Sequence, residues 1–366
     1  MAFNYYRTVT IDYTKCGTAN STDFPFLFYG TYSWLATVAN GGSVQNSSGY
    51  DIAFFSNSSL TTQLKHELIS YTATTGAVEI WVKIPSLSYT SNTIIYIAYG
   101  NSGISTDQSD AANVWDSNHK GVWHLTESPS GTLYDSTSNN NDLTSSGSMD
   151  SSDLVSAKFG NGLIFNGSNQ YLSIADNDSL SITGALTLSC WMNMPNNPAS
   201  ANEGVIAKYR NMTGYSNQRS YELTITPNGY PYAVISSNGT FTSGNYSEVT
   251  YVGDRADGNW HLFHVVFNPS TSLSIYIDGG AYSATNTTSI VSSCYNGTAP
   301  FAIAHQLDTA NANYYANATI DEVRVSSTNR STSWILSEYN NQNSPSTFYS
   351  LGDAVSNTTR RIIIIS

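Results

Sequence analysis

The sequence predicts an all-β protein made of two tandem antiparallel β-sandwiches of the jelly-roll type, with one short helix near the C-terminus. Short apolar runs are separated by clusters of Gly, Asn, Asp and Ser, which is typical of strands and turns. Within runs such as 186–190, apolar and polar residues alternate, so one face is buried and the other solvated. The 366 residues exceed the usual size of one domain, so two are expected.

Residues 1–113 predict the first sandwich. Turn signals recur about every ten residues, the spacing of an all-β domain, and no convincing helix interrupts the pattern. The runs with strand character are 6–11, 24–28, 51–55, 79–85 and 93–101.

Ordered blocks in this region carry a resemblance. YYRTVTID, FPFL, GYDIAFF, LKHELISY, TGAVEIWVKIPSLS and NTIIYIAYGN resemble, in this order, the uncharacterised domain family numbered 2341, a β-sandwich often fused to laminin-G-like modules. The resemblance covers roughly the first 110 residues. That family has no established activity, so the resemblance implies a fold and no function.

A polar, irregular run at 107–120 predicts the domain border, with residues 114–120 as the linker. The second domain is then expected at 121–352, followed by a tail at 353–366. Asp278-Gly279-Gly280 predicts a tight turn that requires positive φ. Strands are expected at 163–165, 171–174, 186–191, 220–225, 231–235, 261–267 and 273–277.

A second set of ordered blocks lies in this domain. GNGLIFNGSNQYLSI, LTLSCWMN, DGNWHLFHVVFN, LSIYIDG and ATIDEVRVSS resemble the laminin-G-like, or concanavalin A-like lectin-glucanase, jelly roll. The resemblance implies a glycan- or protein-binding module, although some glycosidases share the fold.

The C-terminal region predicts the helix. Ser331 or Thr332 is the expected N-cap, and Trp334 and Ile335 are expected to dock the helix on the sandwich. The final residues include four consecutive Ile at 362–365. This run predicts a strand that pairs with an edge of this chain or of a neighbouring subunit.

The charge balance excludes two classes of partner. A net charge of −12 with only 14 Lys and Arg argues against nucleic acid and anionic membranes. No apolar run approaches the roughly 20 residues of a membrane span, so no membrane insertion is expected. The start MAFNYYRTVTID has no basic segment before an apolar core, so no secretory signal is expected.

No catalytic motif emerges, and the chain is predicted not to be an enzyme. The adjacent carboxylates Asp321 and Glu322 point to opposite faces of a strand, whereas glycosidases need two carboxylates that face each other. His66-Glu67 lacks the second His of a zinc-protease motif, because Ser70 stands there. A structural role is expected for this pair.

Calcium is the candidate cofactor. The loop 135–142 is rich in Asp and Asn, which supply oxygen ligands. The resemblance to laminin-G-like domains implies Asp135, Asn140 and Asp321 as ligands. The alternative is that this loop only forms Asx turns. Asp176-Asn177-Asp178 is a second loop candidate for calcium or polar contacts.

Loop tyrosines are the candidate glycan-binding residues, because exposed aromatic rings stack on sugars. The Tyr314-Tyr315 pair is the most suggestive, and Tyr215 and Tyr246 complete the predicted site. In so Tyr-rich a chain, half-buried structural roles are the alternative for each of them.

These observations predict a non-catalytic recognition or structural module. The expected setting is the virion surface, as a phage or archaeal-virus fibre, spike or decoration protein that binds glycans or a host receptor and assembles with other virion proteins or with itself. The alternative is a secreted or cell-surface microbial adhesin or carbohydrate-binding protein. A glycosidase is the least favoured function.

Overall fold

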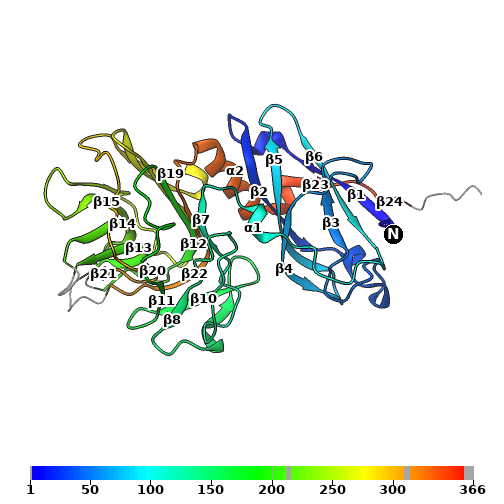
Figure 1. Ribbon diagram of the computed structural model, residues 1–366, viewed down its shortest axis with the longest axis horizontal. Helices are drawn as coiled ribbons and strands as arrows, with labels where there is room; N and C mark the ends of the chain where they lie inside the picture. The colour runs from blue at the N-terminus through cyan, green and yellow to red at the C-terminus, as the bar shows by residue number, and fades with distance from the viewer. Residues whose placement is uncertain (1, 200, 212–215, 309–313, 358–366) are drawn as a thin grey trace, which may run out of the picture. The chain divides into compact units, whose positions relative to one another are not determined.

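The computed structural model describes residues 2–199, 201–211, 216–308 and 314–357, and it confirms the predicted all-β fold (Figure 1). The chain forms two compact units. Unit 1 combines residues 1–116 with 336–366, and unit 2 comprises residues 117–335. No helix in the described part of the chain has the length and hydrophobicity of a membrane span.

Unit 1 contains two antiparallel sheets. Sheet I has the strand order β23-β1-β6-β3, with β24 also paired to β1, and sheet II has the order β2-β5-β4. The strands are β1 (Tyr5–Ile11), β2 (Ser21–Thr31), β3 (Ile52–Phe55), β4 (His66–Thr72), β5 (Ala77–Leu87), β6 (Thr93–Tyr99), β23 (Tyr349–Leu351) and β24 (Val355–Ser356).

The C-terminal segment completes the sandwich of unit 1. Strand β23 pairs with β1, placing Leu351 opposite Val9. The buried amide of Asn341 accepts a hydrogen bond from the Leu27 backbone N–H at 2.7 Å and donates one to its carbonyl at 3.0 Å. The structure therefore differs from the expected border at residue 352, because unit 2 ends at residue 335 and the described residues 336–357 belong to unit 1.

Unit 2 contains two larger sheets. Sheet III has the order β19-β18-β17-β12-β22-β10-β9, with β7 paired to β22, and sheet IV has the order β16-β15-β14-β13-β20-β11-β8, with β21 paired to β13. The strands are β7 (His119–Trp123), β8 (Thr144–Ser146), β9 (Leu154–Ser156), β10 (Asn161–Asn166), β11 (Tyr171–Ile174), β12 (Leu186–Asn193), β13 (Glu203–Asn211), β14 (Gln218–Ile225), β15 (Pro231–Gly239), β16 (Tyr246–Thr250), β17 (Trp260–Asn268), β18 (Ser272–Ile277), β19 (Tyr282–Asn286), β20 (Phe301–Ile303), β21 (Leu307–Asp308) and β22 (Asn317–Ser326).

One hydrophobic core fills unit 2, built from the alternate residues that the sequence pattern indicates. In β12, Leu186, Leu188 and Cys190 are fully buried members of this core. The expected solvated face of this run was wrong, because Thr187 and Ser189 are only 4% and 5% exposed. The Thr187 hydroxyl donates to the Thr328 carbonyl and accepts from the Arg330 N–H, so a chain segment covers this face. The predicted turn after β18 has positive φ at all three positions, with 53° at Asp278. Inward-facing side chains of both sheets thus leave the outer face of sheet IV available for polar and aromatic residues.

Helices are few. The predicted helix is α2 (Thr332–Asn343), and the Ser331 hydroxyl accepts a hydrogen bond from the Trp334 N–H at 3.1 Å, as expected of an N-cap. The remaining α-helices are α1 (Ala111–Val114) and α3 (Pro345–Phe348). Short 3-10 helices span Tyr13–Lys15, Ser33–Leu35, Val38–Asn40, Ser151–Asp153 and Asp278–Gly280.

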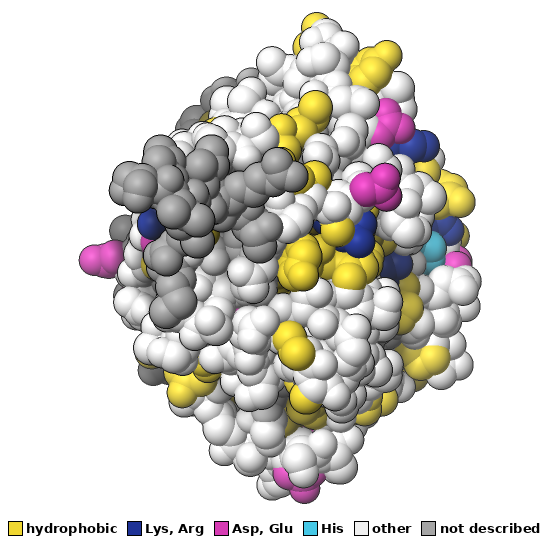
Figure 2. All heavy atoms as spheres, turned by 90° about the vertical axis from the view of Figure 1, so that its right-hand side faces the viewer, with side chains coloured by type: hydrophobic (Ala, Val, Ile, Leu, Met, Phe, Trp, Pro, Cys, Tyr) yellow, Lys and Arg dark blue, Asp and Glu magenta, His cyan; other side chains and the backbone are white. Residues whose placement is uncertain are grey.

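The surface reflects the low charge of the composition. On the face drawn in Figure 2, Lys, Arg, Asp and Glu side chains are few and scattered. Two predicted features, the strand at 362–365 and Tyr215, lie outside the described residues.

Candidate ligand-binding site

The outer face of sheet IV carries a row of side chains that the strand register brings together. Glu222 pairs with Val234, and Val234 pairs with Glu248 on the next strand. Residues directly opposite each other on paired strands share a face. Leu223 and Ala233, the next pair along, belong to the hydrophobic core. The row that contains Glu222 therefore faces away from the core.

A groove of about 440 Å³ lies on this outer face. Its lining combines aromatic rings with amide, hydroxyl and charged groups, the composition expected of a small-molecule or sugar site. The lining residues are Asn202, Tyr209, Arg219, Glu222, Thr226, Tyr232, Phe241, Thr250, Gln306 and Tyr314. We call this set the groove.

Aromatic rings form much of its wall. The Arg219 guanidinium lies 5.5 Å from the centre of the Tyr209 ring. Phe241, which is 42% exposed, stacks on Tyr246 with ring centres 3.9 Å apart and an angle of 16° between the planes. The groove thus offers an exposed aromatic surface already backed by a second ring.

Gln306 places a buried amide in the wall of the groove. Gln306 is 5% exposed, and its side-chain carbonyl oxygen, Oε1, accepts no hydrogen bond. A buried acceptor left unpaired costs about 1–3 kcal/mol, so native structures rarely retain one. The position of Gln306 in the groove wall makes this oxygen an available acceptor for a water molecule or a ligand that donates a hydrogen bond.

A second polar group of the groove already donates a hydrogen bond within the chain. The Tyr232 hydroxyl donates a hydrogen bond of 2.5 Å to Oε2 of Glu248. Burial raises the pKa of Tyr232, and the hydrogen bond and charge of Glu248 and the charge of Glu222 raise it further. The hydroxyl therefore keeps its proton, directed at Glu248, and presents lone pairs to any ligand.

The predicted tyrosines divide among different environments. Tyr314 lines the groove, and Tyr246 supports it through Phe241. Tyr315 instead stacks on His305, with ring centres 4.0 Å apart and an angle of 7°. Burial lowers the pKa of His305 to about 4, so its ring is neutral at pH 7 and the stack carries no charge. Tyr315 is not among the residues that line the groove.

The carboxylate oxygens of Asp135 accept hydrogen bonds from residues of unit 2. Oδ1 of Asp135 accepts hydrogen bonds from the backbone N–H groups of Val122 and Thr137, at 3.0 and 2.9 Å. Oδ2 accepts bonds from the Thr137 hydroxyl and the Asn141 N–H, both at 2.8 Å. Donors occupy both lone-pair sites of each oxygen, so Asp135 does not fit a calcium ligand in this arrangement. The geometry is the Asx-turn alternative.

The other two predicted calcium ligands lie in different contacts. Asn140 is exposed, and its side chain donates to the Ser138 carbonyl. Asp321 is buried and accepts a hydrogen bond from the Phe159 N–H at 2.9 Å. Among the described residues, no three His, Cys, Asp or Glu side chains form a group able to hold a metal ion. The structure does not bring the three predicted ligands together, and calcium stays a prediction.

Glu322 shows why the adjacent carboxylates do not act as a pair. A bulge in β22 gives Glu322 a φ of 53°. Its carboxylate contacts Nδ1 of His124 at 2.6 Å and Nη2 of Arg324 at 2.7 Å. Asp321 contacts Phe159 instead, so the two carboxylates have separate structural partners.

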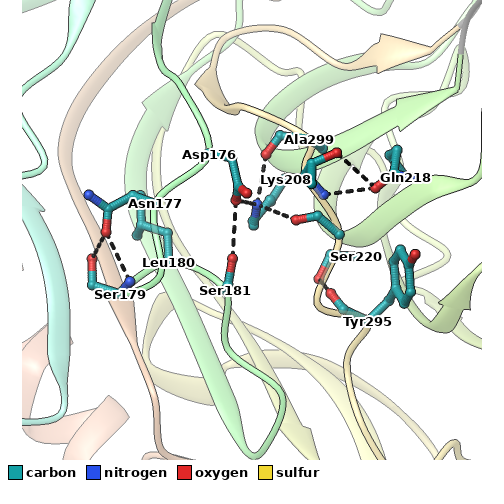
Figure 3. Close-up of polar contacts among 12 residues, drawn as sticks. Asp176, Asn177, Ser179, Leu180, Ser181, Lys208, Gln218, Ser220, Tyr295 and Ala299 are labelled. Atoms are coloured by element: carbon teal, nitrogen blue, oxygen red, sulfur yellow. Dashed lines mark hydrogen bonds and ion pairs between the residues drawn. The ribbon is translucent and has the colours of Figure 1, made fainter. Parts of the chain in front are cut away.

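The loop at 176–178, the second candidate for calcium, instead contacts the ammonium group of a lysine of this chain (Figure 3). Lys208 of β13 is fully buried, and its ammonium contacts Oδ1 of Asp176 at 2.5 Å. It also donates to the carbonyls of Gly297 and Ala299, at 2.9 and 2.7 Å. Burial lowers the pKa of Lys208, while Asp176 opposes that shift. All three ammonium hydrogens have acceptors, so Lys208 ties two loops to the sheet.

Glu222, Tyr232 and Gln306 of the groove were not among the residues predicted from the sequence. A usable signal exists in the hairpin of β14 and β15. Its short turn sets Tyr232 opposite Thr224, and this register places Val234 opposite Glu222. Gln306 had no such signal, because its position depends on the chain after β20.

Two family models match the chain. Residues 166–336 match the concanavalin A-like lectin/glucanases superfamily, and residues 48–145 match the domain of unknown function 2341. Both predicted resemblances are confirmed. No curated protein matches the sequence.

Solved structures with a similar fold include toxin binding domains. The binding domain of Paraclostridial Mosquitocidal Protein 1 aligns with a TM-score of 0.49 and 12% identity, over 63% of this chain and 53% of that one. The binding domain of botulinum neurotoxin serotype D/C VPI 5993 gives 0.46 and 13%, over 64% and 53%. The binding domain of Botulinum Neurotoxin DC in complex with SialylT gives 0.46 and 12%, over 62% and 52%. This chain spans about half the length of each of these structures.

Proposed function

We propose that unit 2 is a non-catalytic carbohydrate-binding module and that the groove on sheet IV is its glycan site. The observation that carries the proposal is the unpaired Oε1 of Gln306 in a wall of aromatic rings. Rings such as Phe241 supply stacking surfaces for a pyranose, and the amide supplies a directed hydrogen bond. The match to a lectin-containing superfamily supports this function.

Absence of catalysis is part of the proposal. Glu222 and Glu248 are separated by the strand that holds Val234, so their backbones lie about 10 Å apart. Glu248 receives the Tyr232 hydroxyl, which occupies one of its oxygens. We therefore expect no release of reducing sugar from any glycan that binds. Hydrolysis that disappears in Glu222→Gln or Glu248→Gln would overturn this part.

A glycan array with the full chain tests binding, and two exposed aromatics of unit 2 provide a matched pair of variants. Phe241 lines the groove and is 42% exposed, whereas Tyr134 lies outside it and is 61% exposed. We expect Phe241→Ala to weaken binding about tenfold, since a stacked ring contributes roughly 1–1.5 kcal/mol. Tyr134→Ala should leave affinity unchanged. Equal losses in both variants, or no bound glycan at all, would reject the groove as the site.

For the setting, we propose the surface of a virion, with a microbial cell surface as the alternative. Both settings fit the composition, since only 11% of residues are charged and the 26 Tyr exceed ordinary usage. Partners would be a glycan or cell-surface receptor together with copies of this chain or other virion proteins. Immunogold labelling of purified particles tests the setting, and label confined to cell envelopes would favour the alternative. Light scattering tests self-assembly, since a strict monomer counts against it.

A further inference from the structure

We propose that the groove binds an oligosaccharide of at least two sugar units, with one unit stacked at an aromatic end of the groove and another hydrogen-bonded at a polar end. This inference rests on the proposed glycan site and narrows the size of its ligand. It follows from where the strands of sheet IV place the residues that line the groove.

The polar end lies where β13 and β15 begin and where β14 and β16 end. Asn202 comes directly before β13, Thr226 directly after β14, and Thr250 is the last residue of β16. These strands pair antiparallel in the order β16-β15-β14-β13. The three side chains therefore line the same end of the sheet.

Gln306 and Tyr314 belong to this polar end as well. The N–H groups of Gly204 and Gln306 both donate to the Tyr314 carbonyl, at 3.0 and 3.2 Å. A Cβ atom at Gly204 would lie 2.3 Å from the Gln306 nitrogen, so the backbone of Gln306 crosses β13 where glycine allows a close approach. Amide and hydroxyl side chains both donate and accept hydrogen bonds, as sugar hydroxyls do. This end is therefore suited to the polar edge of a sugar.

The aromatic end lies at the opposite ends of these strands. Tyr209, near the end of β13, pairs with Arg219 near the start of β14. Phe241 follows β15 and stacks on Tyr246, the first residue of β16. The exposed ring of Phe241 in the groove lining thus offers a flat surface for the apolar face of a pyranose.

The two ends are too far apart for one sugar ring. Tyr209 follows Gly204 by five residues in β13, and Thr250 follows Tyr246 by four residues in β16. At about 3.3 Å per residue, these segments are roughly 13–16 Å long. A pyranose stacked on Phe241 reaches partners one hydroxyl and one hydrogen bond beyond its ring, within roughly 7 Å of the ring centre. Since both ends line one groove, a ligand that contacts both of them contains more than one sugar unit.

Ligand length is the first test. The full chain is titrated calorimetrically with the best oligosaccharide of the array and with each of its constituent monosaccharides. We expect the oligosaccharide to bind at least tenfold more tightly than any single unit, because linked units bind at a high effective concentration. A smaller difference would overturn the inference and leave the glycan site standing. If neither oligosaccharides nor monosaccharides bind, the proposed function fails as well, so the two failures are distinguishable.

Variants at the two ends form the second test. For the oligosaccharide, Phe241→Ala should weaken binding about tenfold and Asn202→Ala about fivefold. Both side chains are partly exposed, so both variants should fold, which thermal unfolding verifies. The double variant should lose about fiftyfold, because changes more than roughly 10 Å apart are additive in free energy. A monosaccharide should respond to one of the two variants only. A monosaccharide weakened by both would place the two side chains at one sugar unit and contradict the inference.

Further variants provide controls and a second probe of the polar end. Tyr134→Ala and Asn161→Ala lie outside the groove lining and should leave affinity unchanged. Gln306→Met should weaken the oligosaccharide about fivefold and leave the monosaccharide that stacks on Phe241 unaffected. An oligosaccharide whose affinity changes in neither Asn202→Ala nor Gln306→Met does not occupy the polar end, and this result would overturn the inference.

Discussion

The Asp135 loop and the groove are two oxygen-rich regions of unit 2. They differ in whether the chain itself supplies hydrogen-bond donors to a buried oxygen. Asp135 receives four hydrogen bonds from within unit 2, three of them from backbone N–H groups. In the groove, Oε1 of Gln306 receives none. A satisfied buried carboxylate holds a loop in place, whereas an unsatisfied buried amide has a cost to stability that a ligand can offset. Local density of Asp and Asn therefore identifies structure as readily as it identifies a site.

Unit 1 contains a parallel case that strengthens the comparison. Asp51 is fully buried, and it accepts hydrogen bonds from the backbone N–H groups of Gln45 and Asn46 at 2.9 Å each. The N–H groups of Gly100 and Asn101 also donate to it, at 3.1 and 3.0 Å. Each unit thus uses a buried aspartate to connect loop backbone that has no strand partner.

Replacing Asp135 has the largest expected effect. Asp135→Ala leaves the N–H groups of Val122, Thr137 and Asn141 without their acceptor, and we expect a loss of about 4 kcal/mol of unfolding free energy. Chemical denaturation measures it. Asn140→Gly is the control in the same loop, because Gly accepts its φ of 53°, and a change within about 0.5 kcal/mol is expected. Similar losses in both variants would refute the role given to the carboxylate.

Lys208 provides a charged version of the same test. Lys208→Met removes the ammonium and leaves Asp176 and the carbonyls of Gly297 and Ala299 without it. We expect a loss of about 3 kcal/mol in thermal or chemical unfolding. Lys158, which lies 3.9 Å from the centre of the Trp191 ring, is the control lysine, and Lys158→Met should cost less. The reverse order would contradict the role given to Lys208.

His261 tests whether a titrating side chain that contacts two carboxylates stabilises the fold in a pH-dependent way. Its ring nitrogens contact Asp278 at 2.7 Å and Asp257 at 3.2 Å. Burial opposes protonation of His261, but the hydrogen bonds and charges of the two carboxylates outweigh it and raise its pKa. A raised pKa in the folded state adds stability below the unfolded pKa of about 6.5, and this stability is lost as pH rises through the folded pKa.

The corresponding variant is His261→Gln. Its free energy of unfolding should lie below that of the wild type by on the order of 1 kcal/mol. This difference should be largest near pH 5.5 and should shrink near pH 8.5. Denaturation curves across this range measure the difference. A deficit that grows with pH would reverse the assignment.

The smallest expected effect on stability carries the most functional information. Gln306→Met removes an unpaired buried acceptor, so stability should stay constant or rise by up to about 1 kcal/mol. Gln170 is the matched glutamine: it is 8% exposed, accepts from the Asn166 N–H and donates to Asp153. Gln170→Met should cost about 1–2 kcal/mol. Opposite signs in the two glutamines would support the comparison, and equal losses would remove the basis of the groove assignment.

Much of the fold was predictable because its causes are local. The alternation in 186–190 determines which side chains of β12 enter the core, although the opposite face is buried as well, and Asp278-Gly279-Gly280 determines the turn after β18. The N-cap was narrowed by its neighbouring residues to Ser331 or Thr332, and the structure shows the Ser331 hydroxyl in that role. The contribution of the C-terminal segment to unit 1 was not predictable, because the contact of Asn341 with Leu27 joins residues 314 positions apart.

The candidate site was likewise predictable only in part. Exposed aromatic residues in a Tyr-rich lectin-like domain were recognisable, and Tyr314 does line the groove. Whether an oxygen is satisfied depends on distant donors, as with Asp321 and Phe159, which are 162 positions apart. The sequence by itself determined the strands and the turns, since these follow from periodicity and turn chemistry, and its ordered blocks carried the resemblance to a concanavalin A-like fold. Only the tertiary structure decided that Asp135 is satisfied and Gln306 is not, because hydrogen-bond partners are assigned by packing.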